Sequence, residues 1–429
     1  MEVLTTVGIA VAFFALIMVS VALHEIGHMV PAKIFGVRVP KYFVGFGPTM
    51  WSTVRGETEY GIKWFPLGGF VKLLGMYPPE PKARKHRNRL TDLADAARAS
   101  EWEEITDTDV ADSRLFYQKK TWQKLIVMAG GPVMNLLIAF ALFWGVTAGY
   151  GIYRAQPTIA YVQQCVITDP NRTECNASDP LTPAAQAGLK AGDRIVSFNG
   201  VPIQSYDQLS TLIRANLAGP AVIVVDRDGT QVTLPQVHTG MNDLPDRLDP
   251  SHQVRVGWLG ISPQQELVKG GPLDVVGDMW TMTQQSVVAL AQFPVKVWNV
   301  AVDLVTGQHR SAYDPISIVG ASQVAGQVAG NADLSNGQKA ATFASLLASV
   351  NLFLALFNLV PLPPLDGGHI AGAIYEWIRR KLAGVFRRPD PGFFDTAKLL
   401  PIAYGVGGFL LLSGVVLVLA DVISPVQLF

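Results

Sequence analysis

Long runs without charged residues dominate the hydrophobic pattern of this chain. Four of them, at 3–23, 125–153, 340–365 and 399–420, are long enough as helices to cross about 30 Å of hydrocarbon. We therefore predict a polytopic α-helical membrane protein with four transmembrane helices. The first two belong to an N-terminal membrane domain, residues 1–155, and the last two to a C-terminal membrane domain, residues 340–429.

A fifth run, residues 279–295, is apolar but carries Thr, Gln and Ser throughout. It has 17 residues, and we predict an amphipathic helix that lies along the membrane surface, with a further span as the alternative. It belongs to a juxtamembrane amphipathic region, residues 264–339. The first run has no basic start and continues directly into polar residues, which is not the pattern of a removable signal peptide.

The first connection, residues 31–124, contains a segment with the pattern of β-structure. Residues 57–74 alternate and are rich in aromatic and β-branched side chains, with interruptions at Pro66 and at Gly68-Gly69. We predict a membrane-associated β-hairpin there. The preceding Gly45-Phe46-Gly47-Pro48 is typical of a turn. Residues 91–113 are acidic and polar, which indicates either a surface helix or a disordered loop.

The central region, residues 156–263, has the composition of a small soluble domain. Short β-rich runs at 158–162, 194–198, 221–226 and 231–234 alternate with turn sequences such as Asn199-Gly200 and Asp228-Gly229. A helical stretch, 206–217, lies between the second and third runs. We therefore predict an inserted α+β domain.

The distribution of charge indicates how the chain crosses the membrane. Of its 34 Lys and Arg residues, 16 lie in 31–124 and six in 364–398, so the positive-inside rule places these connections in the cytoplasm. Both chain ends and the central domain are then extracytoplasmic. We expect the protein in the plasma membrane of the cell, its inner membrane. The basic segment 81–89 either contacts anionic lipid or is a solvated loop. The net charge is zero, which gives no reason to expect a nucleic-acid partner.

Cys165 and Cys175 are the only cysteines, and both fall in the predicted external part. They either form a disulfide that closes a small loop or are two free thiols. With no other cysteine in the chain, a cysteine-based metal site is excluded.

The motif His24-Glu25-Ile26-Gly27-His28 stands at the end of the first apolar run. On a helix, His24 and His28 are four residues apart and face the same way, as two imidazoles that share a zinc ion must. Glu25 lies beside that face, where it can take a proton from a water molecule. The alternative is that the histidines serve only in packing, but ionisable residues at the end of an apolar span are usually functional.

A catalytic zinc site needs a third protein ligand. Four of the remaining histidines, His86, His238, His252 and His309, lie in the basic loop or in external regions. Asp366 is the first charge after 26 uncharged residues, on the same side of the membrane as the histidine motif, and three prolines before it prevent an ordinary helix. We predict that Asp366 completes a site for one Zn²⁺ per chain. Alternatively Asp366 caps the helix that follows it, and His369 is the rival ligand.

These motifs together resemble the site-2 protease family of zinc intramembrane metalloproteases. The resemblance rests on the histidine motif, on Gly131-Pro132-Val133-Met134-Asn135 and on the segment from Asn358 to Gly367. In addition, Tyr42 to Pro48 and Pro66-Leu67-Gly68-Gly69-Phe70 resemble the bacterial branch that cuts anti-sigma factors. Asp314-Pro315-Ile316 departs from relatives that have Gly before Pro, and no predicted catalytic role depends on it.

The resemblance implies an activity and its parts. It implies zinc-dependent hydrolysis of a peptide bond in or near the membrane-spanning segment of single-span proteins, such as anti-sigma factors, in regulated intramembrane proteolysis. Glu25 is then the general base, and Asn358 hydrogen-bonds near the substrate or the oxyanion. We assign substrate binding to Asn358, to Asn135 and to the hairpin residues Gly68, Gly69 and Phe70, where a substrate could add as a strand; an ordinary structural hairpin is the alternative.

The segment Thr182 to Ile195 resembles part of a PDZ domain, which implies one such domain in the central region. It could bind an exposed peptide C-terminus, with Gly257-Trp258-Leu259-Gly260 as its carboxylate-binding loop, or it could act as a size filter. Two other classes of protein stay open. One is a non-proteolytic membrane scaffold that uses its PDZ domain; the other is a transporter, which the lack of an internal repeat disfavours.

Overall fold

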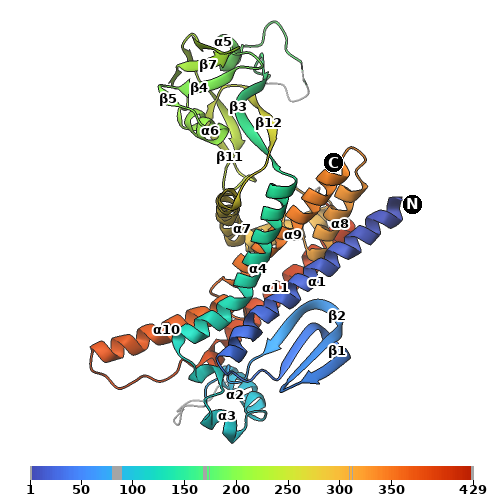
Figure 1. Ribbon diagram of the computed structural model, residues 1–429, viewed down its shortest axis with the longest axis vertical. Coiled ribbons are helices and arrows are strands. Elements are labelled where there is room, and N and C mark those ends of the chain that lie inside the picture. The colour runs from blue at the N-terminus through green and yellow to red at the C-terminus, as the bar shows by residue number, and fades with distance from the viewer. Residues whose placement is uncertain are drawn as a thin grey trace. The chain divides into compact units, whose positions relative to one another are not determined.

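The computed structural model describes residues 2–79, 89–167, 172, 174–308, 310–311 and 313–426. The basic segment 81–89 lies outside the described residues, except for Arg89. The chain divides into two compact units, one of Met1–Gly145 with Val275–Phe429 and the other of Val146–Asp274. The first unit contains most of the long helices and the second contains most of the strands (Figure 1).

Each charge-free run forms a long helix, as predicted. These helices are α1 (Glu2–Ile34), α4 (Thr121–Gly149), α9 (Asn336–Asn358) and α11 (Leu400–Ile423). Helix is favoured in such runs because it satisfies every backbone hydrogen bond within the segment, without water. The long apolar helices and the separate β-containing unit agree with the predicted fold class at this level.

The predicted number of four spanning helices is not confirmed, because a further helix has the length and composition of a span. Residues 279–295 lie within α7 (Pro272–Thr306), a continuous helix of 35 residues. Five helices of the described chain, α7 included, are long and apolar enough to cross a membrane. The prediction ended this segment at the charges of Asp278 and Lys296, but single charges do not end a helix. The charge-free length was therefore a poor measure of the length of α7.

Helix α8 (Ile318–Gly330) packs along α1 and is tied to the end of α11. The carboxylate of Asp421 accepts hydrogen bonds from the backbone N–H groups of Ser317 and Gly320 at 2.7 and 3.1 Å. It also forms an ion pair with the buried Arg310, at 2.7 Å. The negative charge at the start of α8 is favourable because the first N–H groups of a helix lack partners within the helix.

The β-hairpin begins earlier than predicted. Its strands are β1 (Lys41–Arg55) and β2 (Thr58–Lys72), so the chain reverses at Gly56-Glu57 and not at 45–48. Gly45 and Gly47 have φ angles of 91° and 85°, and they bend β1 without reversing it. Each strand bends so that its first and last segments lie in different rows of the same sheet. Residues 41–44 pair with 59–62 and also with 69–72, which leaves 69–72 as one edge of the sheet and 51–55 as the other.

Short helices complete the first unit. The polar segment 91–113 forms α2 (Arg89–Trp102) and α3 (Asp107–Ala111), so the helical alternative was right. A 3-10 turn, η1 (Phe116–Gln118), precedes α4. After α9 the proline-containing segment 359–365 is not helical, and α10 (Asp366–Val385) starts directly behind it. A second 3-10 turn, η2 (Thr396–Leu399), leads into α11.

The second unit is built on a sheet with the strand order β12-β3-β4-β7-β8, in which β5 pairs with β4. Its strands are β3 (Ile152–Val162), β4 (Arg194–Phe198), β5 (Val201–Pro202), β7 (Ile223–Arg227), β8 (Thr230–Thr233) and β12 (Ile261–Val268). Two smaller pairings join β6 (Pro220–Ala221) to β9 (Val237–His238) and β10 (Gly240–Pro245) to β11 (Gln253–Trp258). The helices are α5 (Pro183–Gln186) and α6 (Tyr206–Ala215).

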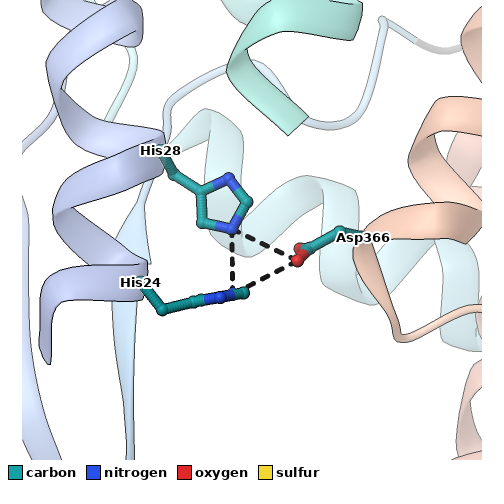
Figure 2. Close-up of side chains that lie close together, drawn as sticks. All are labelled: His24, His28 and Asp366. Atoms are coloured by element: carbon teal, nitrogen blue, oxygen red, sulfur yellow. Dashed lines mark hydrogen bonds and ion pairs between the residues drawn. The ribbon is translucent and has the colours of Figure 1, made fainter. Parts of the chain in front are cut away.

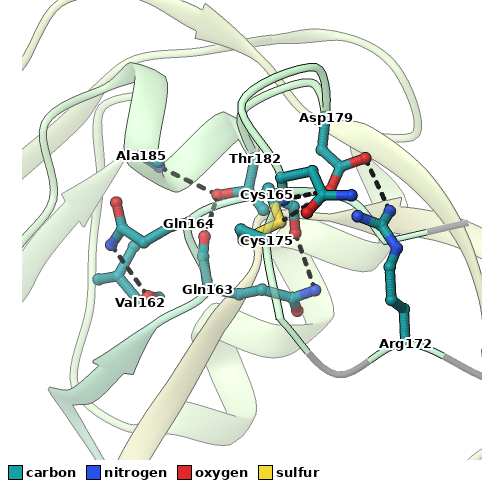
Figure 3. Close-up of a disulfide and its surroundings, with 10 residues drawn as sticks. Val162, Gln163, Gln164, Cys165, Arg172, Cys175, Asp179, Thr182 and Ala185 are labelled. Atoms are coloured by element: carbon teal, nitrogen blue, oxygen red, sulfur yellow. Dashed lines mark hydrogen bonds and ion pairs between the residues drawn. A yellow bond between two sulfur atoms is a disulfide. The ribbon is translucent and has the colours of Figure 1, made fainter.

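The elements predicted for the central region are present within a unit that extends beyond 156–263 at both ends. β4 has the predicted bounds, and the other strands and α6 agree to within a few residues, apart from β3, which starts at Ile152. The core includes Ile195, Phe198, Leu209, Ile223 and Leu259, which are almost fully buried. Cys165 and Cys175 form a disulfide, which confirms the first of the two alternatives (Figure 3).

Candidate active site

His24, His28 and Asp366 meet in one cluster, although the aspartate is more than 330 residues from the histidines in the sequence (Figure 2). The two Nε2 atoms are 3.2 Å apart. The Asp366 Oδ2 atom lies 3.3 Å from Nε2 of His24 and 3.2 Å from Nε2 of His28. Both histidines are buried and come from α1, while Asp366 is the first residue of α10.

The backbone determines which ring nitrogen of His28 faces the cluster. Nδ1 of His28 lies 2.8 Å from the carbonyl oxygen of Val127 on α4. A carbonyl oxygen only accepts, so Nδ1 carries a proton and Nε2 is the ring nitrogen left to bind a metal. In metal-binding histidines, the ring nitrogen that does not face the metal usually donates its N–H to a carbonyl or carboxylate oxygen in this way.

Two glycine contacts bring α4 and α1 together at the cluster. A Cβ atom on Gly27 would lie 2.3 Å from the carbonyl oxygen of Gly130, so the two backbones touch. A Cβ atom on Gly131 would lie 2.3 Å from Nε2 of His28 and 2.6 Å from Nε2 of His24. The two helices can approach this closely because glycine has no side chain at these positions.

The cluster fits a zinc ion. In a tetrahedral site with bonds of about 2.0–2.1 Å, neighbouring ligand atoms are about 3.3 Å apart, which agrees with the three distances in the cluster. Three protein ligands leave a fourth position open, as in catalytic rather than structural zinc sites. Burial would raise the pKa of the Asp366 carboxyl, but the two facing imidazoles outweigh it and lower this pKa, so the group is ionised.

Neither alternative for the aspartate is found in the described part of the chain. The residue before α10, Leu365, makes no side-chain cap, and the Asp366 carboxylate points to the histidines (Figure 2). His369 is not in the cluster. It lines a separate cavity of about 20 Å³ together with Lys124 and Glu376, which form a buried ion pair.

Glu25 lies under the edge of the sheet formed by β1 and β2. A Cβ atom on Gly69 would be 3.3 Å from Cγ of Glu25, so the edge segment 69–72 passes directly over this side chain. Gly68 and Phe70 flank this contact, and the Phe70 ring stacks on Phe43 with ring centroids 5.7 Å apart. The segment predicted to hold a substrate is thus beside the predicted general base.

The two asparagines predicted to bind substrate are less directly connected to the cluster. Asn358 is the last residue of α9, and its amide donates to the carbonyl of Leu354 at 3.1 Å. Asn135 on α4 is almost fully buried, and its Oδ1 has no hydrogen-bond partner among the described residues. No described contact joins either side chain to the three-residue cluster.

Comparison with known proteins identifies the family. The peptidase family M50 matches residues 12–387. This chain belongs to peptidase family M50. The zinc metalloproteases Rip1 of Mycobacterium tuberculosis and Mycolicibacterium smegmatis are both 35% identical to it, over 98% of this chain and 98% and 99% of theirs. A putative zinc metalloprotease of Rhizobium meliloti is 28% identical over 87% of this chain and 88% of its own.

Membership in the M50, or site-2 protease, family confirms the predicted class of enzyme. The protein is a zinc metalloprotease, with zinc as its cofactor, and an integral membrane protein. Family membership also implies proteolysis within the membrane, and hence membrane proteins as substrates. The scaffold and transporter alternatives are therefore set aside. Sequence reasoning quoted Gly131 only as part of a motif and missed Val127, because a backbone carbonyl has no side-chain signature.

Proposed function

We propose that this M50 protease hydrolyses a peptide bond in or beside the membrane-spanning segment of single-span proteins, with anti-sigma factors as the substrate class. The proposal is carried by the cluster of His24, His28 and Asp366, with Glu25 beside it, at the end of an apolar helix. The cleavage takes place in the inner membrane, and the cluster lies near its cytoplasmic side. The chain ends and the unit 146–274 are then extracytoplasmic and α7 lies along the membrane surface, because the basic connections 31–124 and 364–398 stay inside.

In this proposal His24, His28 and Asp366 hold zinc, which when bound supplies Lewis-acid polarisation and an acidified water. Glu25 takes a proton from the attacking water and passes it to the leaving amine. The carbonyl of Val127 keeps His28 in the tautomer that offers Nε2. Asn358 and Asn135 bind the substrate near the scissile bond, and the free Oδ1 of Asn135 is an acceptor for a substrate N–H.

Removal of zinc is the first test of this function. Dialysis of the purified protein against a chelator is expected to abolish cleavage of a single-span substrate, and one equivalent of Zn²⁺ is expected to restore it. Asp366→Asn is expected to lower the zinc affinity by at least about tenfold, because a neutral amide replaces an ionised ligand. Metal analysis and gel-based cleavage measure both effects. Full activity in metal-free protein would contradict the proposal.

The substrate is proposed to add as an extended strand along 69–72. A helical substrate hides its peptide bonds, so it must unwind, and an open sheet edge offers unpaired backbone groups to the unwound segment. The location of this edge over Glu25 supports the proposal.

Cysteine crosslinking tests the substrate strand. Both native cysteines are in a disulfide, so an introduced cysteine is the only reactive thiol. In a Glu25→Gln background, Phe70→Cys is expected to crosslink to cysteines placed along the substrate span. Thr53→Cys, on the opposite edge of the same sheet, is the control and is expected not to crosslink. Equal crosslinking from both edges would exclude strand addition at 69–72.

The unit 146–274 is proposed to contain one PDZ-type domain that recruits substrate. Its strand β12 follows Gly257-Trp258-Leu259-Gly260 and is an edge of the sheet, where a peptide C-terminus can add. Deletion of residues 156–263 is then expected to lower cleavage of every substrate severalfold. Faster cleavage of substrates whose outer domain is still intact would instead indicate a size filter.

A further inference from the structure

Helix α10 has an apolar face that no element of the described chain covers. Ile374, Ile378, Leu382 and Val385 follow one another at helical spacing, and their side chains are 41%, 44%, 51% and 75% exposed. Tyr375 and Trp377 extend this face on its two sides and are about half exposed. Figure 1 shows α10 leaving the other long helices sideways, with its later turns away from them.

The opposite side of α10 is occupied by the chain itself. Glu376 is buried, pairs with Lys124 at 3.1 Å, and accepts a hydrogen bond from the backbone N–H of Phe394 at 2.9 Å. Arg379 donates to the carbonyl oxygens of residues 391–393. Packing on one side only, with a continuous apolar face on the other, is the pattern of a helix that lies in a membrane interface.

A groove between α10 and α4 indicates how deep in the membrane the apolar face of α10 lies. The groove has a volume of about 450 Å³ and is lined by Thr121, Trp122, Leu125, Ile374 and Trp377. Thr121 is the first residue of α4, where that candidate span begins. Tryptophans concentrate at the boundary between hydrocarbon and headgroups, so Trp122 and Trp377 place the apolar face of α10 at this boundary.

The charges on α10 indicate which lipid it contacts. Residues 379–388 hold five basic side chains and no acidic one. Arg379 and Arg380 are engaged by the chain, since Arg380 lies 3.3 Å from Asp390, whereas Lys381, Arg387 and Arg388 are exposed. A basic amphipathic helix binds anionic headgroups while its apolar face enters the headgroup boundary.

We propose that α10 lies along the membrane surface and binds anionic phospholipid through Lys381, Arg387 and Arg388, and that this contact positions Asp366. Asp366 is the first residue of the same helix, so the orientation of α10 and the position of the carboxylate are linked. The position of the Asp366 carboxylate thus depends on the contact of α10 with lipid. The membrane contact itself is independent of the function proposed above, and only its effect on cleavage rests on that function.

Membrane contact can be measured on the full-length protein without any cleavage assay. Ile378→Cys is labelled with an environment-sensitive fluorophore and reconstituted into vesicles of phosphatidylcholine alone or mixed with phosphatidylglycerol. We expect the label to be better protected from an aqueous quencher in the mixed vesicles. A label at Ala383, on the other side of α10, is expected to show no such difference. Equal protection of the Ile378 label in both vesicle types would overturn the proposal.

Cleavage in the same vesicles tests the link to Asp366. Wild-type protein is expected to cut a co-reconstituted single-span substrate at least about threefold faster in the mixed vesicles. The triple variant Lys381→Gln, Arg387→Gln, Arg388→Gln is expected to lose this difference. The control triple Lys190→Gln, Arg194→Gln, Arg255→Gln changes the net charge equally with exposed residues of the other unit and is expected to keep it.

The two proposals fail in different ways. A lipid effect on cleavage that survives in the α10 triple variant would overturn the role of these three residues. Protection of the Ile378 label without any cleavage in either vesicle type would count against the proposed function, but it would support the membrane contact of α10.

Discussion

Glu25→Gln is expected to lower the rate of substrate cleavage by about 10²–10⁴-fold and to leave the zinc content unchanged. The glutamine has nearly the same shape but cannot take up a proton at neutral pH. Glu25 is not among the three residues whose ligand atoms converge, so its replacement leaves the proposed metal ligands in place. Metal analysis and initial rates on a single-span substrate measure the two effects separately.

The matched control is Glu103→Gln, which removes the same charge from an exposed position after α2. It is expected to retain full activity. If Glu25→Gln kept more than about a tenth of the activity, Glu25 would not be the general base. If it lost zinc as well, its role would be to hold the metal site and not to move a proton.

The cluster could be predicted from the sequence because its signals are local. Two histidines four residues apart share a helix face whatever the rest of the fold does. Asp366 was found because a charge directly after a long uncharged run, behind three prolines, is rare. In contrast, the contact of Gly131 with both imidazoles depends on how α4 crosses α1, and nothing in the sequence near Gly131 names its partner.

The errors in the fold have a similar cause. Gly45 and Gly47 bend β1 instead of ending it, because the pairing of 41–44 with two other segments holds the strand together across the bend. Glycine-rich sequence is compatible with a turn and with a bulge, and only tertiary pairing decides between them. The length of α7 was underestimated because the run was cut at isolated charges, which a helix accommodates on its polar face.

Gly131→Ala is expected to remove both zinc binding and cleavage, with a loss of zinc affinity of at least about 10–100-fold. The new Cβ atom would lie 2.3 Å from Nε2 of His28 and 2.6 Å from Nε2 of His24, the two atoms proposed to bind the metal. The imidazoles have little room to retreat. His28 is held by the carbonyl of Val127, and the helices cannot adjust freely because Gly27 and Gly130 already touch.

The control for this variant lies on the same helix. Gly145→Ala adds a methyl group that meets nothing within 4 Å, and it is expected to keep zinc and activity. Alanine favours a helix over glycine by about 1 kcal/mol, so neither variant should weaken α4 itself. A thermal unfolding temperature at or above that of the wild type, together with lost zinc, would therefore assign the defect of Gly131→Ala to the metal site. Full zinc content in Gly131→Ala would contradict the close approach of α4 to the two imidazoles.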